Sequence, residues 1–211
     1  MSKIYLFSIS SHKDAISVNS LDIKILKPSI DFSSYDYLII TSKQTSRALK
    51  QYSNEQYIDK KALCISTQSA LAFEEIGGSV LELGGGYGDN IEQIIKKYPK
   101  SVKWLYLRAK EVASDFVKVC KEDSYDIDEK IVYESDCSKA IMDLKIDDNA
   151  TLIFTSPSTV SCFLQTNTIN RSFKVIVIGK TTAKALPKAI NYTISNQRTI
   201  QSCIDLAQGE R

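Results

Sequence analysis

The segment Thr151–Ala189, TLIFTSPSTVSCFLQTNTINRSFKVIVIGKTTAKALPKA, decides the fold of this chain. It contains two short apolar, β-branched runs, Thr151–Phe154 and Val175–Ile178, each followed by a turn of small or hydroxyl-bearing residues and then by a helical pattern. This alternation predicts βαβ units in a parallel sheet. Because ligands bind at the carboxyl ends of strands in such sheets, the turns Thr155–Thr159 and Gly179–Thr182 are candidate walls of a site.

An earlier part of the chain repeats this design. LIITS at Leu38–Ser42 corresponds to LIFTS at Leu152–Ser156, and KALCISTQSA at Lys61–Ala70 corresponds to KVIVIGKTTA at Lys174–Ala183. The two pairs are separated by almost the same length of chain, which a chance likeness between single strand–helix units would not produce. Two copies are too few for a repeat array. The duplication therefore predicts two similar domains.

The whole pattern indicates an α/β protein, with about ten strands alternating with about nine helices. Two parallel sheets of about five strands suit this length better than one sheet of ten. We expect a discontinuous domain of residues 1–29 and 135–211, with a second domain of residues 30–131 inserted into it. The chain would cross between the domains near 26–32 and 129–136.

The composition is ordinary for a soluble globular protein, with 43% hydrophobic and 25% charged residues. A net charge of +2 gives no overall attraction to nucleic acid. No apolar run approaches the roughly 18 residues of a membrane span, and the first residues lack a signal-peptide layout.

The cysteines form no CxxC pair, so we expect reduced thiols in a cytoplasmic protein. These are Cys64, Cys120, Cys137, Cys162 and Cys203. The single histidine, His12, cannot form a metal site alone. At the N-terminus, Lys3–Ile9 predicts a strand, and a short helix is expected after His12.

A rival signal lies in VLELGGGYGDNIEQI at Val80–Ile94. Its Gly84–Gly88 loop resembles the first motif of class I S-adenosylmethionine-dependent methyltransferases, in which backbone amides at a helix N-terminus approach the ligand. Such a site needs an acidic residue at the end of the next strand, whereas the run Val102–Leu107 is followed by Arg108. A glycine-rich connection without a ligand is the other interpretation.

Four segments resemble the uroporphyrinogen-III synthase family, the cyclising enzymes of haem biosynthesis. They are TSPSTVSCF at Thr155–Phe163, IGKTTAKAL at Ile178–Leu186, LIITSKQTSRAL at Leu38–Leu49 and IVYES at Ile131–Ser135. Their order and spacing match as well, so the resemblance spans nearly the whole chain. It implies two α/β domains, the second inserted in the first and joined to it by a two-stranded antiparallel ladder. It also implies a monomer that works in a cleft between the domains without metal or cofactor.

The resemblance further implies a cyclising hydro-lyase that acts on hydroxymethylbilane, a linear tetrapyrrole with eight carboxylates. The enzyme removes the terminal hydroxyl as water, closes the macrocycle and inverts ring D through a spirocyclic intermediate. Loss of that hydroxyl at neutral pH needs a nearby proton donor. Tyr133 matches the family's cleft tyrosine, and a phenol with a pKa of about 10 remains protonated and can donate. The alternative for Tyr133 is simple packing within a strand.

The carboxylates of such a substrate need hydrogen-bond donors, and the turns after the strands supply them. Backbone N–H groups at helix N-termini, hydroxyls and basic side chains all favour carboxylate binding. The expected substrate-binding residues are Thr41, Ser42, Lys43, Ser69, Arg108, Ser156, Ser158, Thr159, Gly179, Lys180, Thr181 and Thr182. Each hydroxyl could instead be an ordinary helix cap, and each cation a solvated surface residue.

Two other functions are open from the residues themselves. One is the methyltransferase that would use the Gly84–Gly88 loop. The other is a non-catalytic two-lobed binder of a small anionic ligand, because a fold alone does not establish a function. If the resemblance to uroporphyrinogen-III synthases holds, the expected partner is a small-molecule substrate, and neither nucleic acid nor a membrane is expected to bind.

Overall fold

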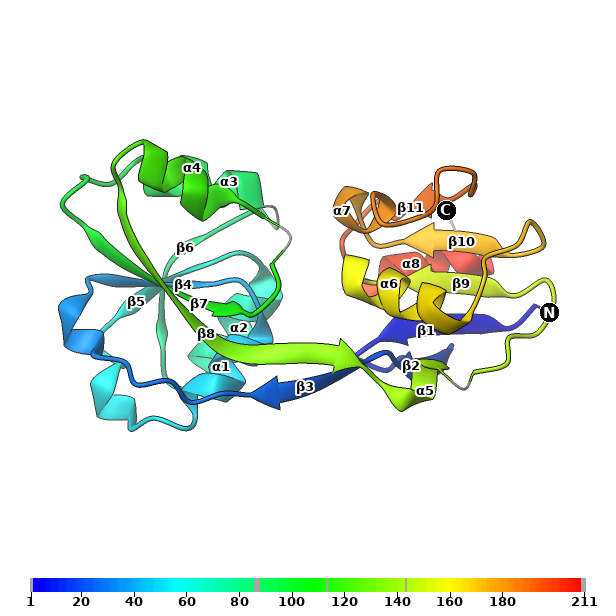
Figure 1. Ribbon diagram of the computed structural model, residues 1–211, viewed down its shortest axis with the longest axis horizontal. Helices are drawn as coiled ribbons and strands as arrows, with labels where there is room; N and C mark the ends of the chain where they lie inside the picture. Colours follow the sequence, from blue (N-terminus) through cyan, green and yellow to red (C-terminus); the bar gives the residue numbers. More distant parts are fainter. Residues whose placement is uncertain (1, 86–87, 113, 143, 210–211) are drawn as a thin grey trace. The chain divides into compact units, whose positions relative to one another are not determined.

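Two sheets, each in its own unit, organise the chain (Figure 1). The computed structural model describes residues 2–85, 88–112, 114–142 and 144–209. Unit 1 comprises Met1–Asp22 and Asp136–Arg211, and unit 2 is the inserted segment Ile23–Ser135. The first boundary thus lies before the expected 26–32 segment, and the second lies at the end of the expected 129–136 segment.

The sheet of unit 1 has the strand order β11-β10-β9-β1-β2, and all of its pairings are parallel. Its strands are β1 (Ile4–Ser8), β2 (Ile16–Asn19), β9 (Thr151–Phe154), β10 (Lys174–Val177) and β11 (Thr193–Ile194). Its helices are α5 (Lys139–Met142), α6 (Pro157–Thr166), α7 (Lys180–Ala183) and α8 (Ile200–Gln208). The expectation of a short helix after His12 is wrong, because a turn there leads directly into strand β2.

The core of unit 1 lies on both faces of its sheet. Phe7 and Phe154 stack with ring centroids 4.8 Å apart on the face covered by α5, α6 and α7. Leu6 and Ile153 face the other way and pack against α8. Strands covered on both faces read as continuous apolar runs, which is why β1, β9 and β10 were recognisable from the sequence.

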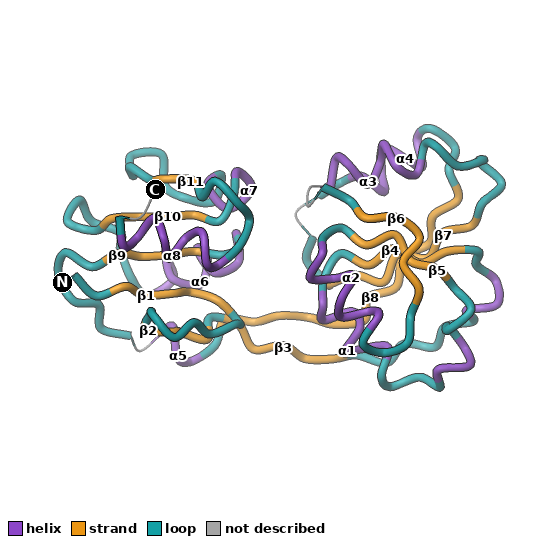
Figure 2. The backbone as a smooth tube through the Cα atoms, turned by 180° about the vertical axis from the view of Figure 1, so that it is seen from behind, coloured by secondary structure: helices purple, strands orange, loops and turns teal. Residues whose placement is uncertain are grey.

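The sheet of unit 2 has the strand order β3-β8-β7-β4-β5-β6. Its strands are β3 (Leu21–Ile25), β4 (Tyr37–Ile40), β5 (Lys61–Cys64), β6 (Ser79–Leu83), β7 (Lys103–Ala109) and β8 (Asp126–Cys137). Its helices are α1 (Lys43–Leu49), α2 (Thr67–Glu74), α3 (Gly88–Ile95) and α4 (Phe116–Glu122), with short 3-10 turns η1 (Phe32–Ser34) and η2 (Asn54–Gln56). As the course of the tube shows, α1 and α2 cover one face and α3 and α4 the other (Figure 2).

Strands β3 and β8 form the connection between the units. Both cross a unit boundary, and they run in opposite directions beside each other (Figure 1). The backbone N–H of Leu26 donates to the carbonyl of Val132 at 2.9 Å, and Lys24 forms an ion pair with Glu134 at 2.8 Å. The remaining pairings of unit 2 are parallel. The two parallel α/β domains and the antiparallel ladder expected from the sequence are therefore confirmed.

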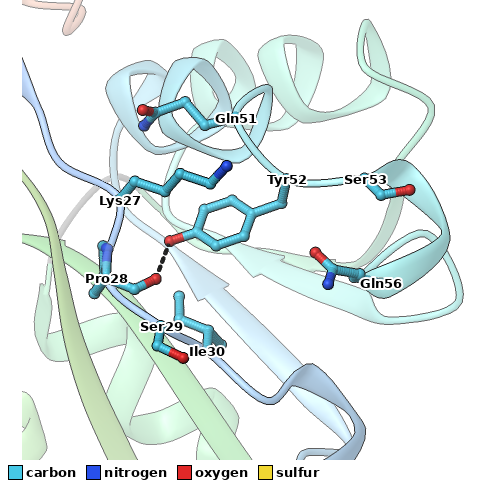
Figure 3. A pocket seen from close by; sticks show the side chains of 8 residues that line it. All are labelled: Lys27, Pro28, Ser29, Ile30, Gln51, Tyr52, Ser53 and Gln56. Atoms are coloured by element: carbon cyan, nitrogen blue, oxygen red, sulfur yellow. Dashed lines mark hydrogen bonds between the residues drawn. The ribbon is translucent and has the colours of Figure 1, made fainter.

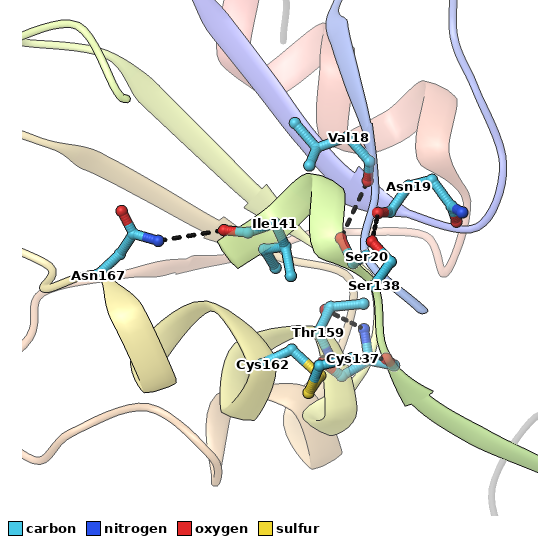
Figure 4. Close-up of a disulfide and its surroundings, with 10 residues drawn as sticks. Val18, Asn19, Ser20, Cys137, Ser138, Ile141, Thr159, Cys162 and Asn167 are labelled. Atoms are coloured by element: carbon cyan, nitrogen blue, oxygen red, sulfur yellow. Dashed lines mark hydrogen bonds between the residues drawn. A yellow bond between two sulfur atoms is a disulfide. The ribbon is translucent and has the colours of Figure 1, made fainter. Parts of the chain in front are cut away.

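The expectation of reduced thiols is wrong for two of the cysteines. Cys137 at the end of β8 and Cys162 in α6 form a disulfide across a sequence separation of 25 (Figure 4). Their Cα atoms are 5.3 Å apart, within the usual range for a disulfide. The sequence could not reveal the pair, because only the packing of α6 beside the end of β8 brings the two thiols together. Cys64, Cys120 and Cys203 are free and buried, as core residues.

Candidate active site

Tyr133 lies on β8 in unit 2 with 8% of its surface exposed. The pairing of β7 with β8 shifts between Arg108 and Ala109, so that Ala109 is paired with Tyr133. The carbonyl of Tyr133 also accepts a hydrogen bond from the backbone N–H of Lys110 at 2.9 Å. Burial raises the pKa of Tyr133, and a hydrogen bond with the side chain of Ser42 opposes that shift only partly. The phenol is therefore protonated at neutral pH and able to donate.

Ser42 belongs to the turn between β4 and α1, where the sequence places two candidate residues. Its hydroxyl caps α1 by accepting from the backbone N–H of Gln44 at 3.2 Å, and its side chain hydrogen-bonds Tyr133. The preceding hydroxyl, on Thr41, hydrogen-bonds the phenol of Tyr106 at 3.0 Å. The structure thus gathers Thr41, Ser42 and Tyr133 at the carboxyl end of β4, beside a second tyrosine.

Tyr106 is a residue that the sequence analysis did not single out. It lies on β7 with 3% of its surface exposed, and its ring packs against Phe116 with centroids 5.0 Å apart. Burial raises the pKa of Tyr106 to about 12. The signal that could have found it is its place on β7 two residues before Arg108, which puts both side chains on the same face of the sheet.

Arg108 follows on the same strand and is partly buried. Its Nε lies 3.5 Å from a carboxylate oxygen of Glu129, and its Nη2 donates to the carbonyl of Lys110 at 3.0 Å. Its positive charge opposes, as a smaller effect, the burial that raises the pKa of Tyr106. Arg108 is therefore held near Tyr106, and Glu129 partly balances its charge. Lys43, at the start of α1, is exposed.

Ser69 is held differently from the other candidates of unit 2. Its hydroxyl donates to the carbonyl of Ser66 at 2.7 Å, and its backbone N–H donates to the Ser66 hydroxyl at 3.3 Å. The Ser69 hydroxyl also accepts from the backbone N–H of Ser66 at 3.0 Å, which completes the capping box of α2, and Ser69 is 1% exposed. The hydrogen bonds of the Ser69 side chain are therefore used to cap α2.

The turn before α6 in unit 1 repeats this arrangement. Ser156 caps α6 by accepting from the backbone N–H of Thr159 at 3.2 Å, and the Thr159 hydroxyl donates to the carbonyl of Ser156 at 2.8 Å. Thr159 is buried within this capping box, whereas Ser158 is exposed. Pro157 occupies the first turn, where its missing N–H costs nothing.

The turn before α7 has no such side-chain cap. Gly179 is the N-cap residue, and no side-chain hydrogen bond closes the first turn. Lys180 is exposed, Thr181 is half-buried and Thr182 is buried. A Cβ atom on Gly179 would lie 3.1 Å from Nε of Arg198, a residue from the loop before α8 that the sequence analysis did not identify. This turn therefore lacks a side-chain cap and has two basic side chains, Lys180 and Arg198, in or beside it.

The glycine loop lies elsewhere in unit 2. It follows β6, which is the edge strand of the sheet, whereas ligands in such folds bind where the strand order reverses. Gly84 donates to the carbonyl of Cys64 at 2.7 Å, and a Cβ there would lie 3.2 Å from the carbonyl oxygen of Ile65. Close backbone packing thus accounts for this glycine. Gly86 and Tyr87 lie outside the described residues.

A surface pocket of about 460 Å³ is also present in unit 2 (Figure 3). Tyr52 donates its hydroxyl to the carbonyl of Pro28 at 2.6 Å, and Lys27 Nζ lies 5.7 Å from the centroid of the Tyr52 ring. Its lining residues are Lys27, Pro28, Ser29, Ile30, Gln51, Tyr52, Ser53 and Gln56, none of which is a predicted site residue. Within the described ranges, no group of three or more potential ligands could hold a metal ion.

Comparison with known proteins identifies relatives of this chain. A family model described as uroporphyrinogen-III synthase HemD matches residues 13–205. Among solved structures, uroporphyrinogen-III synthetase from Helicobacter pylori is 23% identical, with a TM-score of 0.82 over 100% of both chains. A mutant uroporphyrinogen III synthase from the extremely thermophilic bacterium Thermus thermophilus is 13% identical, with a TM-score of 0.64 over 99% of this chain and 97% of the other. No curated protein matches the sequence.

Proposed function

Because the chain belongs to the uroporphyrinogen-III synthase HemD family, we propose that it cyclises hydroxymethylbilane to uroporphyrinogen III with Tyr133 at the reacting centre. The observation that carries the role of Tyr133 is its place among the strand-end hydroxyls of unit 2, hydrogen-bonded to Ser42. No observation favours the methyltransferase or the non-catalytic binder.

The reaction needs a proton at the departing hydroxyl. Hydroxide is a poor leaving group, so the terminal C–O bond breaks readily only as the oxygen receives a proton. Burial keeps the Tyr133 phenol protonated, so in this proposal it donates that proton or orients the oxygen that receives it. The electron-rich pyrrole stabilises the cation left on carbon. The protein must then hold the two ends of the linear substrate together, which is an orientation effect.

We propose that strand-end turns bind the carboxylates of the substrate. In unit 2 we propose Thr41, Ser42, Lys43, Ser69 and Arg108, and in unit 1 Ser156, Ser158, Thr159, Gly179, Lys180, Thr181 and Thr182. The support differs among them. Ser69 and Thr159 are buried and engaged in capping boxes, so they act by shaping their turns. The turn at Gly179 has the strongest support, because its amides lack a side-chain cap and Lys180 and Arg198 lie beside it.

The experiment that tests this function is direct. The protein is incubated with hydroxymethylbilane, and the type I and type III porphyrinogens are separated after oxidation to porphyrins. We expect the type III isomer. Formation of the type I isomer alone, at the rate of the blank, would contradict the proposal. Binding of S-adenosylmethionine measured by calorimetry would revive the methyltransferase.

We further propose that the enzyme is a cytoplasmic monomer. No helix in the described part of the chain is long and apolar enough to cross a membrane. Three free, buried thiols support a reducing location, whereas the Cys137–Cys162 disulfide is more typical of an oxidising one. The redox state of that pair in freshly lysed cells, measured by thiol trapping, tests the location. Sedimentation velocity tests the monomer.

A further inference from the structure

We infer that Tyr106 is a positioning residue for Tyr133: its hydroxyl fixes the Thr41–Ser42 turn, and Ser42 on that turn holds the hydroxyl of Tyr133. The inference rests on the proposed role of Tyr133 only for its effect on the reaction. The geometric part, that Tyr106 controls where the Tyr133 hydroxyl lies, stands on the contacts within unit 2 alone.

The first link joins β7 to the end of β4. Strands β4 and β7 are parallel neighbours, and Tyr106 is paired with Ile39. From that position the phenol reaches two residues further along β4 and hydrogen-bonds the hydroxyl of Thr41 at 3.0 Å. The ring itself is buried against Phe116, so packing fixes the direction in which the hydroxyl points. Thr41 is therefore attached to a rigid part of the sheet.

The second link joins the same turn to β8. Ser42 follows Thr41 directly, and its side chain hydrogen-bonds Tyr133 while also capping α1. One helical turn later, the hydroxyl of Thr45 donates to the carbonyl of Leu107 on β7 at 3.1 Å. The start of α1 is thus tied to β7 on both sides of Ser42, by Thr41 and by Thr45. Removing the Tyr106 hydroxyl would release one of these two ties.

The burial of Tyr106 separates this role from a catalytic one. Its side chain is 3% exposed, and its hydroxyl already has a partner in Thr41. A group in that position acts on the substrate through the residues that it holds. Tyr52 provides a matched control, because it is a tyrosine of the same unit whose hydroxyl also makes a hydrogen bond, to Pro28. Its ring packs against the core cluster that contains Tyr133, and Tyr52→Phe keeps that ring while removing a hydroxyl that has no described hydrogen bond to Ser42 or Tyr133.

The decisive measurement observes Tyr133 itself. The full chain is labelled with tyrosine carrying ¹³C at the ring carbon bonded to oxygen, and the Tyr133 resonance is assigned as the one lost in Tyr133→Phe. We expect Tyr106→Phe and Thr41→Val to shift that resonance, whereas Tyr52→Phe leaves it in place. An unchanged Tyr133 resonance in Tyr106→Phe would overturn the inference, whatever the activity of the variant.

Kinetics then shows whether this positioning matters for the reaction. We expect Tyr106→Phe to lower kcat about tenfold with little change in KM, an effect of misorientation, and to unfold at the same temperature as Tyr52→Phe. In the Tyr133→Phe background the further loss should be less than about twofold, because residues acting as a unit are not additive. Additive losses would overturn the positioning role while leaving Tyr133 as proposed. A Tyr133→Phe variant with full activity would remove the proposed role of Tyr133, and the resonance alone would then decide the inference.

Discussion

Ser42, in the turn between β4 and α1, hydrogen-bonds Tyr133 on β8, although the two residues lie far apart in the sequence. The contact is possible because β4 and β8 both pair with β7, so that the end of β4 lies near the part of β8 that pairs with the end of β7. The same serine caps α1. One hydroxyl therefore stabilises a helix and sets the place of the tyrosine that we propose as proton donor, and its two roles can be separated by experiment.

Replacement of Ser42 by alanine should affect both stability and activity. Loss of a helix cap costs about 1 kcal/mol of unfolding free energy, and Ser66→Ala, which removes the cap of α2, should cost a similar amount. Of these two variants, only Ser42→Ala should also lower kcat, by several-fold, because the side chain removed is the one that hydrogen-bonds Tyr133. Urea unfolding and steady-state kinetics of both variants check this. Equal kcat values for the two variants would contradict the role of Ser42.

Tyr133→Phe should slow the reaction without changing its product. Loss of a general acid typically costs about 100-fold or more in rate, but the remaining enzyme still orients the substrate, so the type III isomer should persist. Because burial raises the pKa of Tyr133, the wild-type activity should not fall from loss of this proton until the pH exceeds 10. A pH–rate profile and product chromatography test both points. Undiminished kcat in Tyr133→Phe would remove the residue from the mechanism.

Ionisation of the Tyr106 phenol should make the folded protein less stable at alkaline pH. Its pKa is raised to about 12 on folding, so between pH 10 and 12 the folded state holds a proton that the unfolded state loses. Stability is therefore full below pH 10 and falls as the pH rises toward 12, by roughly 2–3 kcal/mol for this group. Urea unfolding at pH 8, 10 and 11 should show a smaller alkaline loss in Tyr106→Phe than in the wild type. Identical losses would show that Tyr106 ionises equally in both states.

Reduction of the Cys137–Cys162 disulfide should weaken unit 1 selectively. Opening a loop of this length costs about 3 kcal/mol in the chain-entropy description. The chain's one tryptophan, Trp104, lies in the core of unit 2 and reports on that unit alone. Dithiothreitol should therefore shift the urea transition seen by circular dichroism and leave the Trp104 fluorescence transition in place. The Cys137→Ser/Cys162→Ser double variant should not respond to dithiothreitol; if it does, another group is responsible.

Lys180 should contribute to substrate binding through charge. Lys180→Met is expected to raise KM for hydroxymethylbilane several-fold and to leave kcat nearly unchanged, because a lost ground-state contact lowers binding uniformly. Lys184→Met is the matched control, since Lys184 is an exposed lysine at the other end of α7. The KM effect of Lys180→Met should shrink at high salt, where exposed charges are screened. Equal KM values in the two variants would remove Lys180 from the site.

Local signals in the sequence were sufficient for much of this organisation. Apolar runs such as Leu38–Ile40 and Leu152–Phe154 are strands because they are buried on both faces, and the serines that follow, Ser42 and Ser156, are helix caps. The equivalence of these two turns in the two units was visible as a repeat in the sequence. Helix caps and strand patterns depend on residues within a few positions of one another, and such short-range effects can be read directly from the chain.

Contacts between distant segments were decided only by the tertiary structure. The sequence indicated that Thr41 and Ser42 follow one strand and that Tyr133 lies on another, but the register of β4 against β7 placed the Tyr106 hydroxyl on Thr41. The packing of α6 beside β8 likewise joined Cys137 to Cys162, contrary to the sequence expectation. Register and packing result from the burial of whole sheets, so no local pattern encodes which hydroxyl or thiol meets which partner.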